Sequence, residues 1–191
     1  MMRIITGRAR GTRLATLPGD ATRPTSERAK EALFSMVQFD IAGSRVLDLF
    51  AGTGQLALEA LSRGAERAVL VDGSAAAIDI IRRNAEKTHF SDKCDIIRAD
   101  YAEASARLSG KESFNLVFLD PPYHKGLVTE ALGLLLSYNL LAPYATVVCE
   151  SEDAGGDVIA GLHGSDAFEV RKISRYGIAR VTLLCYSGRG I

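Results

Sequence analysis

The sequence has 191 residues, 47% of them hydrophobic, and its formal net charge at pH 7 is zero. This length suits one compact domain that can bury a core without disulfides or metals. No apolar run of about 18 residues is present, and the start "MMRIITGRARG" lacks the apolar segment of a secretory signal, so we expect a cytoplasmic protein without a membrane partner. The three cysteines and three histidines are scattered, which indicates reduced cysteines in the core and no metal site.

The charges are unevenly distributed along the chain. Residues 1–30 carry seven Lys or Arg and two acids, residues 171–191 carry five and none, and residues 31–170 carry 11 and 21. Solvated chain ends are one explanation. Two basic ends around an acidic body favour a polyanionic partner instead, and composition alone does not separate nucleic acid from another acidic partner.

The first 40 residues predict a small extension that precedes a main domain at 41–191. The stretch "MRIITGRARGTRLATLP" has β-branched residues on both sides of Gly7 and Gly11, which predicts a small basic hairpin or an extended arm. A helix follows, with Thr25 or Ser26 as its N-cap. Its apolar residues recur at helical spacing and predict a packed face, with Arg28 and Lys30 left for the other side. The residues of that face are Ala29, Leu33, Met36 and Val37.

From residue 45 onward, strand patterns alternate with helix patterns. Such alternation predicts an α/β fold with a parallel, doubly wound, Rossmann-like sheet, in which ligands bind at the carboxyl ends of the strands. Near the end, "FEVRKISRYGIARVTLLCY" contains two strand patterns with no room for a crossover helix, so we expect an antiparallel pair at the edge of the sheet. The five strands expected before this pair are "RVLDLF", "RAVLVD", "CDIIRAD", "FNLVFLD" and "ATVVCESE".

A glycine-rich loop joins the first expected strand to a helix. In "DLFAGTGQLALEA", Gly52, Thr53, Gly54 and Ala57 match the dinucleotide fingerprint, and Asp72 ends the next strand. An NAD-dependent oxidoreductase is therefore an alternative of a different class. The glycine pattern alone is weak evidence for that ligand.

Asp48 favours a different cofactor. It lies in the strand four residues before Gly52, where a carboxylate would repel a pyrophosphate and attract a ligand with an ammonium and a sulfonium. S-adenosylmethionine carries both charges and no phosphate. Asp72 is then placed to accept the two ribose hydroxyls. Asp100 ends the third strand and would receive the adenine amino group, with Tyr101 beside the ring; a helix N-cap is the alternative for Asp100.

The tetrapeptide Asp120-Pro121-Pro122-Tyr123 ends the fourth expected strand. Neither proline donates a backbone hydrogen bond, so the strand stops here, and a turn is one sufficient explanation. An exocyclic amine of a base is a poor nucleophile, because its lone pair is delocalised into the ring. The Asp120 side chain and the Pro121 carbonyl would accept its N–H groups and turn the lone pair toward the sulfonium. Tyr123 would stack on the flipped base.

With these motifs in view, the sequence resembles the bacterial small-subunit ribosomal RNA guanine-N2 methyltransferases, a class I family that uses S-adenosylmethionine. The resemblance covers nearly the whole chain, while Asp-Pro-Pro-Tyr alone is shared with DNA adenine-N6 methyltransferases. It rests on "MRIITGRARGTRL", "TRPTSERAKEALF", "VLDLFAGTGQLALEALSRGA", "VLVD", "FNLVFLDPPY" and "YGIARVTLL".

The resemblance implies roles for individual residues. Cofactor contacts are implied at Asp48, Phe50, Gly52, Thr53, Gly54, Asp72, Gly73, Asp100 and Tyr101, although Gly73, Gln55 and Ala57 depart from the residues usual at these positions. Base handling is implied for Asp120, Pro121, Pro122 and Tyr123. Arg23, Pro24, Thr25 and Arg28 are implied to line the site from the amino-terminal side. RNA contacts are expected for Arg3, Arg8, Arg10, Arg13, Arg23, Thr25 and Arg28.

The leading interpretation is methyl transfer to the N2 of a guanine in 16S rRNA, with the rRNA or the assembling small subunit as partner and the protein as a monomer. The alternatives are a DNA adenine-N6 methyltransferase, an NAD-dependent oxidoreductase and a non-catalytic RNA-binding assembly factor. No separate DNA-recognition domain is apparent in the sequence, and the intact Asp120–Tyr123 motif argues against the last alternative.

Overall fold

The computed structural model describes residues 2–17, 27–122, 126–152, 166–177 and 179–188, except for the side chains of residues 27, 28 and 152. Its centre is a seven-stranded sheet with the order β3-β2-β1-β4-β5-β7-β6. The strands are β1 (Arg45–Asp48), β2 (Arg67–Asp72), β3 (Cys94–Arg98), β4 (Phe114–Leu119), β5 (Leu141–Glu152), β6 (Phe168–Tyr176) and β7 (Ala179–Tyr186).

The sheet confirms the predicted fold class. Strands β1 to β5 pair in parallel, whereas β7 pairs antiparallel with both β5 and β6. The chain runs outward from β1 to β3 and then returns to place β4 on the other side of β1. This reversal opens a crevice between the loops that follow β1 and β4, which is where ligands of such sheets bind.

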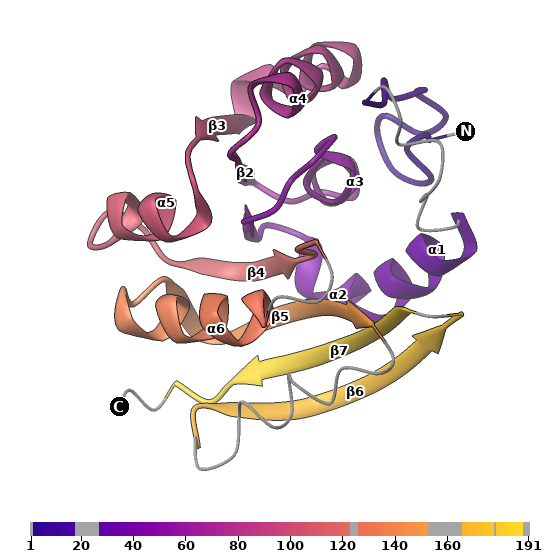
Figure 1. The fold of residues 1–191 in the computed structure, drawn as a ribbon. Helices are drawn as coiled ribbons and strands as arrows, with labels where there is room; N and C mark the ends of the chain where they lie inside the picture. The colour runs from indigo at the N-terminus through magenta and orange to yellow at the C-terminus, as the bar shows by residue number, and fades with distance from the viewer. Residues whose placement is uncertain (1, 18–26, 123–125, 153–165, 178, 189–191) are drawn as a thin grey trace.

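Helices cover both faces of the sheet (Figure 1). On one face, α1 (Glu27–Met36), α2 (Gln38–Ile41), α3 (Gln55–Ser62) and α4 (Ala75–Thr88) enclose one core cluster. On the other face, α5 (Tyr101–Leu108) and α6 (Leu127–Ser137) enclose a second core cluster. A short 3-10 helix, η2 (Ser91–Lys93), precedes β3. These apolar layers fix the positions of the strand ends.

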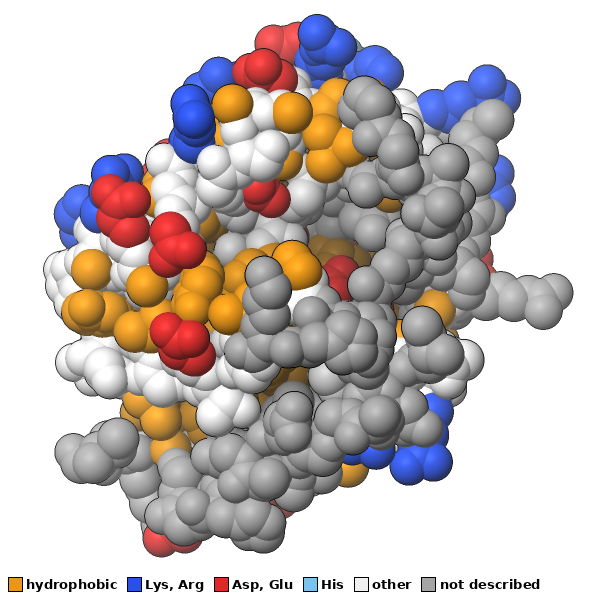
Figure 2. Space-filling view, in the orientation of Figure 1, with side chains coloured by type: hydrophobic (Ala, Val, Ile, Leu, Met, Phe, Trp, Pro, Cys, Tyr) orange, Lys and Arg blue, Asp and Glu red, His pale blue; other side chains and the backbone are white. Residues whose placement is uncertain are grey.

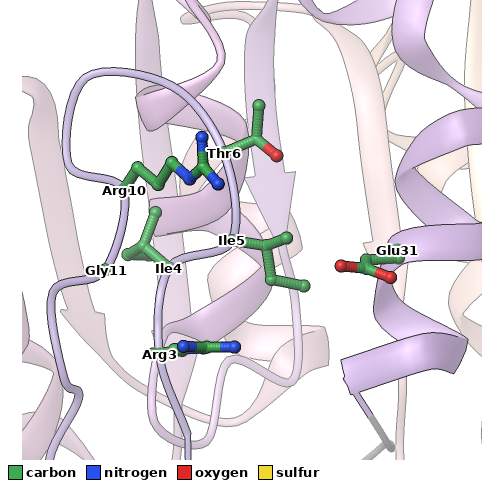
Figure 3. Close-up of a pocket in the computed structure, with 7 residues that line it drawn as sticks. All are labelled: Arg3, Ile4, Ile5, Thr6, Arg10, Gly11 and Glu31. Atoms are coloured by element: carbon green, nitrogen blue, oxygen red, sulfur yellow. The ribbon is translucent and has the colours of Figure 1, made fainter.

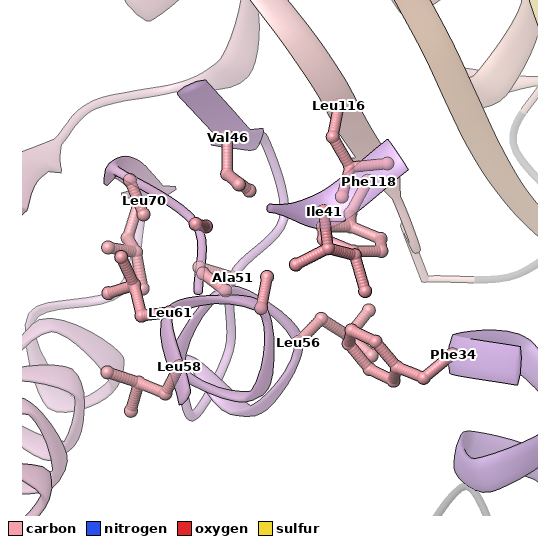
Figure 4. Close-up of a cluster of buried hydrophobic side chains, with 14 of the residues drawn as sticks. Phe34, Ile41, Val46, Ala51, Leu56, Leu58, Leu61, Leu70, Leu116 and Phe118 are labelled. Atoms are coloured by element: carbon pink, nitrogen blue, oxygen red, sulfur yellow. The ribbon is translucent and has the colours of Figure 1, made fainter. Parts of the chain in front are cut away.

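The predicted face of α1 is buried. Ala29, Leu33 and Val37 are fully buried, and Met36 is half-buried. Phe34 of the same helix packs against Phe118 of β4 with ring centroids 5.8 Å apart (Figure 4). The predicted N-cap residues of this helix lie outside the described residues.

The amino-terminal arm, residues 2–17, folds back on itself and packs on the body. An antiparallel bridge joins Arg3 to Arg13, and the Ile4 amide donates to the Thr12 carbonyl at 3.0 Å. Ile4 and Leu14 belong to the same core cluster as residues of the sheet, so the arm is part of that core. Figure 1 shows the arm and α1 on one side of the molecule and α5 on the opposite side.

The buried carboxylate of Glu59, on α3, holds the arm in place. Its oxygens accept the amides of Ile5 at 2.8 Å and Thr6 at 3.0 Å. They also pair with Arg63 Nε at 2.9 Å and Lys30 Nζ at 3.3 Å. Two cations and two amides therefore compensate the desolvation of one carboxylate, as a buried charge requires.

The predicted exposure of Lys30 is wrong. Lys30 is only 2% exposed, and its ammonium also donates to the Arg3 carbonyl at 2.6 Å. A helical pattern alone could not reveal this, because the partners lie 27 and 29 residues away in sequence.

The three cysteines are free. Cys149 is buried, whereas Cys94 and Cys185 are only half-buried. Within the described residues, no helix is long and apolar enough to cross a membrane.

Candidate active site

A cleft of about 1180 Å³ opens at the carboxyl ends of β1, β2, β4 and β5. Figure 2 shows a hollow near the middle of this face, with an acidic side chain deep inside it. The arm closes one side of the cleft through Met2, Thr16 and Leu17. The expected site residues that line it are Asp48, Phe50, Gly52, Thr53, Asp72, Gly73, Asp100, Tyr101, Asp120, Pro121 and Pro122.

Asp48 is the last residue of β1 and is 1% exposed, yet it lines the cleft. Burial raises the pKa of its carboxyl to about 7, and the neighbouring Asp72 charge adds to the rise, while hydrogen bonds from the Phe50 and Ala57 amides oppose it. Its Oδ1 atom has no hydrogen-bond partner among the described residues. A buried acceptor that faces a cleft without a donor is suited to a cationic or hydrogen-donating ligand.

The glycine loop after β1 is held by internal hydrogen bonds. The Gly52 amide donates to Asp72 Oδ2 at 2.9 Å, and the Gly54 amide donates to the Ala51 carbonyl at 2.7 Å. Gly54 caps α3 in the left-handed conformation, packs against Leu70 and does not line the cleft. Because a pyrophosphate binds through free loop amides, this engagement of two of them disfavours a dinucleotide.

Asp72, at the end of β2, is held from both sides. In addition to the Gly52 amide, it accepts the Ser74 amide at 2.8 Å through Oδ1. A carboxylate has about four lone-pair sites, so both oxygens keep acceptor capacity for ligand hydroxyls. Ser74 in turn caps α4. The carboxylate is thus oriented before any ligand arrives.

An aromatic pair forms another wall of the cleft. The rings of Phe50 and Tyr101 lie 5.1 Å apart, and burial together with a hydrogen bond to Glu130 raises the pKa of Tyr101 to about 12. Asp100 accepts the Ala102 amide at 2.9 Å and caps α5, so the N-cap alternative is observed. The two rings are tilted by 39° to each other and form an apolar wall.

The Asp-Pro-Pro segment follows β4 directly. Asp120 is half-buried, Pro121 is buried and Pro122 is exposed, and all three line the cleft. Tyr123 lies outside the described residues. The strand therefore ends at Leu119, as predicted, and Asp120 places a carboxylate in the same cleft as the glycine loop.

The cleft also contains a residue that the sequence reasoning missed. Glu150 of β5 is 7% exposed and lines the cleft. The sequence signal for Glu150 was its place near the carboxyl end of a strand.

A second missed residue, the buried Asn84 of α4, bridges the arm and the glycine loop. Its Oδ1 accepts the Ala15 amide at 2.7 Å, and its Nδ2 donates to the Ala15 carbonyl at 3.1 Å and the Thr53 carbonyl at 2.9 Å.

The expected RNA-binding residues of the arm are exposed. Arg3 and Arg10 line a second cavity of about 290 Å³ between the arm and α1, with Glu31 across from them (Figure 3). Arg8 and Arg13 are also exposed. Arg23, Pro24, Thr25 and the Arg28 side chain lie outside the described residues.

Comparison with known proteins identifies relatives along most of the chain. "Putative rRNA methyltransferase YlbH" of Bacillus subtilis is 36% identical over 152 residues, covering 79% of this chain and 83% of that protein. "Ribosomal RNA small subunit methyltransferase D" of Escherichia coli is 36% identical over 156 residues, covering 81% and 77%. The solved structure titled "Putative methyltransferase yhhF from Escherichia coli" has a TM-score of 0.84 and 30% identity over 98% of this chain and 99% of that one.

A family model described as "Conserved hypothetical protein 95" matches residues 2–184. This match includes the arm, the glycine loop, the Asp-Pro-Pro segment and most of the antiparallel pair. The chain therefore belongs to the family described as Conserved hypothetical protein 95, with proteins named as ribosomal RNA small subunit methyltransferases among its relatives.

Proposed function

We propose that the protein is a 16S rRNA (guanine-N2)-methyltransferase that uses S-adenosyl-L-methionine. The observation that carries the proposal is one cleft lined by a buried carboxylate with an open acceptor, Asp48, and by the Asp120-Pro121-Pro122 segment. In this proposal residues 41–191 form the catalytic domain and residues 1–40 an RNA-binding extension. The protein acts in the cytoplasm as a monomer on the rRNA or the assembling small subunit.

The cofactor half of the cleft fits S-adenosylmethionine by charge and shape. Asp48 would attract its ammonium, Asp72 would accept its ribose hydroxyls, and the Phe50–Tyr101 pair would flank its adenine. When bound there, the cofactor supplies a methyl group activated by a sulfonium. The buried Asp48 and the hydrogen-bonded Asp72 need little reorganisation to hold such a ligand.

The opposite half of the cleft would hold the target base. Asp120 would accept one N–H of the guanine amine and the Pro121 carbonyl the other, which frees the lone pair to point at the methyl group. Asp120 need not be a strong base, because the amine proton becomes acidic after methyl transfer. Most of the rate would come from orientation.

Two of the alternatives differ from this proposal in class or substrate. Oxidoreduction with NAD is disfavoured by the buried Asp48 and by the internal bonds of the Gly52 and Gly54 amides. A DNA adenine methyltransferase shares the Asp-Pro-Pro-Tyr motif. Several relatives that cover about four fifths of this chain carry rRNA names, which favours RNA.

The test uses small-subunit RNA from a strain that lacks the gene. Purified protein and labelled S-adenosylmethionine should transfer methyl groups to this RNA and to little else. Digestion to nucleosides and mass spectrometry should identify N2-methylguanosine. Methylation of duplex DNA, or identical methylation of the RNA in both strains, would overturn the proposal.

A further inference from the structure

Glu150 is a buried carboxylate in the candidate cleft to which the proposed function gives no role. It lies near the end of β5, is 7% exposed and lines the cleft together with Asp120. Burying an ionisable carboxylate is costly unless hydrogen-bond donors surround it. A group of this kind in a substrate cleft is a candidate for ligand recognition.

The strand register places Glu150 beside Asp120. Leu119, the last residue of β4, pairs with Cys149 of β5. The residues that follow this pair are Asp120, directly after β4, and Glu150 of β5. Neighbouring parallel strands lie about 4.8 Å apart. The two carboxylates therefore leave adjacent strands at the same level of the sheet.

The alternation of side chains fixes the side on which Glu150 lies. Leu119 and Cys149 belong to the core beneath α5 and α6, whereas Phe118 and Val148 belong to the core beneath α1 and α3. Because side chains alternate along a strand, Glu150 shares the side of Val148. Asp120 and Glu150 then line one cleft as neighbours.

Two adjacent carboxylates match the hydrogen-bond pattern of one base edge. Guanine presents N1–H and N2–H₂, two neighbouring donors, on its Watson–Crick edge. Adenine presents an amine next to an N1 acceptor, which would face a carboxylate without a hydrogen atom between them. Since an ionised carboxylate only accepts hydrogen bonds, the pair selects guanine.

We propose that Glu150 accepts the N1–H of the target guanine while Asp120 holds the N2 amine, which makes Glu150 the residue that separates guanine from adenine. The inference rests on the proposed function, because it needs a guanine in the cleft. It requires an ionised carboxylate at Glu150, because a protonated one could also donate to the N1 of adenine.

The experiment compares two RNA substrates that differ only at the methylated position. One carries guanine, and the other carries 2-aminopurine, which keeps the amine but lacks the N1–H. Wild-type protein should prefer guanine in kcat/KM by more than about 100-fold, since a site built for a hydrogen bond rejects an analogue that lacks it. Equal rates on both substrates would overturn the role of Glu150 without any variant.

Variants then assign the preference to Glu150. In E150Q the side-chain amide can donate to N1 of 2-aminopurine, so the preference for guanine should shrink by at least about tenfold. In E150A both substrates should be poor. A merely structural residue would lower both rates by the same factor, and an unchanged ratio in E150Q would overturn the inference.

Two controls separate the possible failures. Glu169, exposed on β6, provides a matched variant, E169Q, that should keep the wild-type ratio. Calorimetric binding of S-adenosylhomocysteine to E150Q should match that of wild type and shows that the cofactor half is intact. If wild-type protein methylates no guanine at all, the proposed function fails. If wild-type protein methylates guanine and E150Q keeps the full preference for guanine over 2-aminopurine, only the role of Glu150 fails.

Discussion

The titration of Asp48 links the stability of the protein to its ligand. The unfolded chain releases this proton near pH 3.8, whereas the folded protein holds it to about pH 7 because burial disfavours the charge. The folded state therefore binds more protons between these values, and the contribution of Asp48 to stability falls as the pH rises toward 7. A cationic ligand at the carboxylate would reverse this penalty.

This linkage predicts how ligand affinity depends on pH. An ammonium beside Asp48 would lower its pKa, so binding of S-adenosylhomocysteine should release a proton below about pH 7. Affinity should rise with pH by up to about tenfold per unit between roughly pH 5 and 7. Calorimetry in two buffers with different ionisation enthalpies measures both the affinity and the proton release.

The variant D48N serves as the control for this prediction. It should bind the ligand weakly, with an affinity that no longer depends on pH over this range. Without ligand it should gain stability over wild type at pH 8 but not at pH 5. If the affinity of the wild-type protein for S-adenosylhomocysteine did not change between pH 5 and 7, the role given to Asp48 would be contradicted.

At Asp120 the expected effect lies in turnover rather than in cofactor binding. D120A removes an acceptor that orients the amine, and it should lower kcat by roughly 100-fold or more. D120N keeps a side-chain oxygen as an acceptor and should lose less. Affinity for S-adenosylhomocysteine, measured by calorimetry, should stay within about threefold of wild type in both variants. Equal kcat values of D120A and wild type would overturn the role given to Asp120.

At the scale of the elements, the packing of the arm depends on glycine at position 7. A Cβ atom on Gly7 would lie 1.8 Å from the Ser62 carbonyl oxygen. The same region includes the Arg8 amide, which donates to that carbonyl at 2.8 Å. Any larger residue must displace the arm from α3.

Gly11 offers a matched control for this close approach. Gly7 and Gly11 have φ values of +88° and +84°, but nothing lies within 4 Å of a Cβ on Gly11. Both alanine variants should lose about 1 kcal/mol of stability from backbone strain. Only G7A should also free the arm, which limited proteolysis and denaturant titration would detect. Equal losses in the two variants would show that the close approach at Gly7 does not hold the arm.

The elements differ in how well the sequence predicted them. Alternating apolar runs are local signals, and they predicted the strands, their parallel pairing and the antiparallel pair. Glu59 and Lys30 gave no such signal, because their compensating partners lie in other elements. Asn84 is equally hidden: its hydrogen bonds reach 31 and 69 residues back along the chain. Polar groups buried by distant partners require the tertiary structure.

The same distinction holds within the candidate site. Asp72 and Asp120 were predicted from their places at strand ends, and Asp48 from its place in the strand before the glycine loop. All three line the cleft. The placement of Gly54 behind the loop was not foreseen, since a glycine can be required either for ligand approach or for a left-handed cap. Tyr123 and the Arg23–Arg28 side chains remain predictions.

At the scale of the whole molecule, part of the basic charge serves the fold itself. Lys30 is neutralised inside by Glu59, and Arg171 of β6 pairs with Asp40 of α2 at 3.2 Å. At the amino-terminal end, the exposed arginines of the arm are therefore the residues that favour a polyanionic partner. They belong to the same arm as Met2, Thr16 and Leu17, which line the cleft. RNA held by the arm would be close to the proposed methyl donor.

Charge reversal in the arm tests this arrangement. R8E combined with R10E should weaken binding to small-subunit RNA and flatten the dependence of log K on log salt, by roughly one unit of slope for each phosphate that the arm no longer neutralises. The matched control reverses Arg107 and Lys111, which are exposed on and just after α5, on the opposite side of the molecule (Figure 1). Filter binding between about 50 and 200 mM salt measures both slopes. If the arm variant kept the wild-type slope, the arm would not touch phosphates; if the slope of the control fell equally, the two pairs would act through net charge alone.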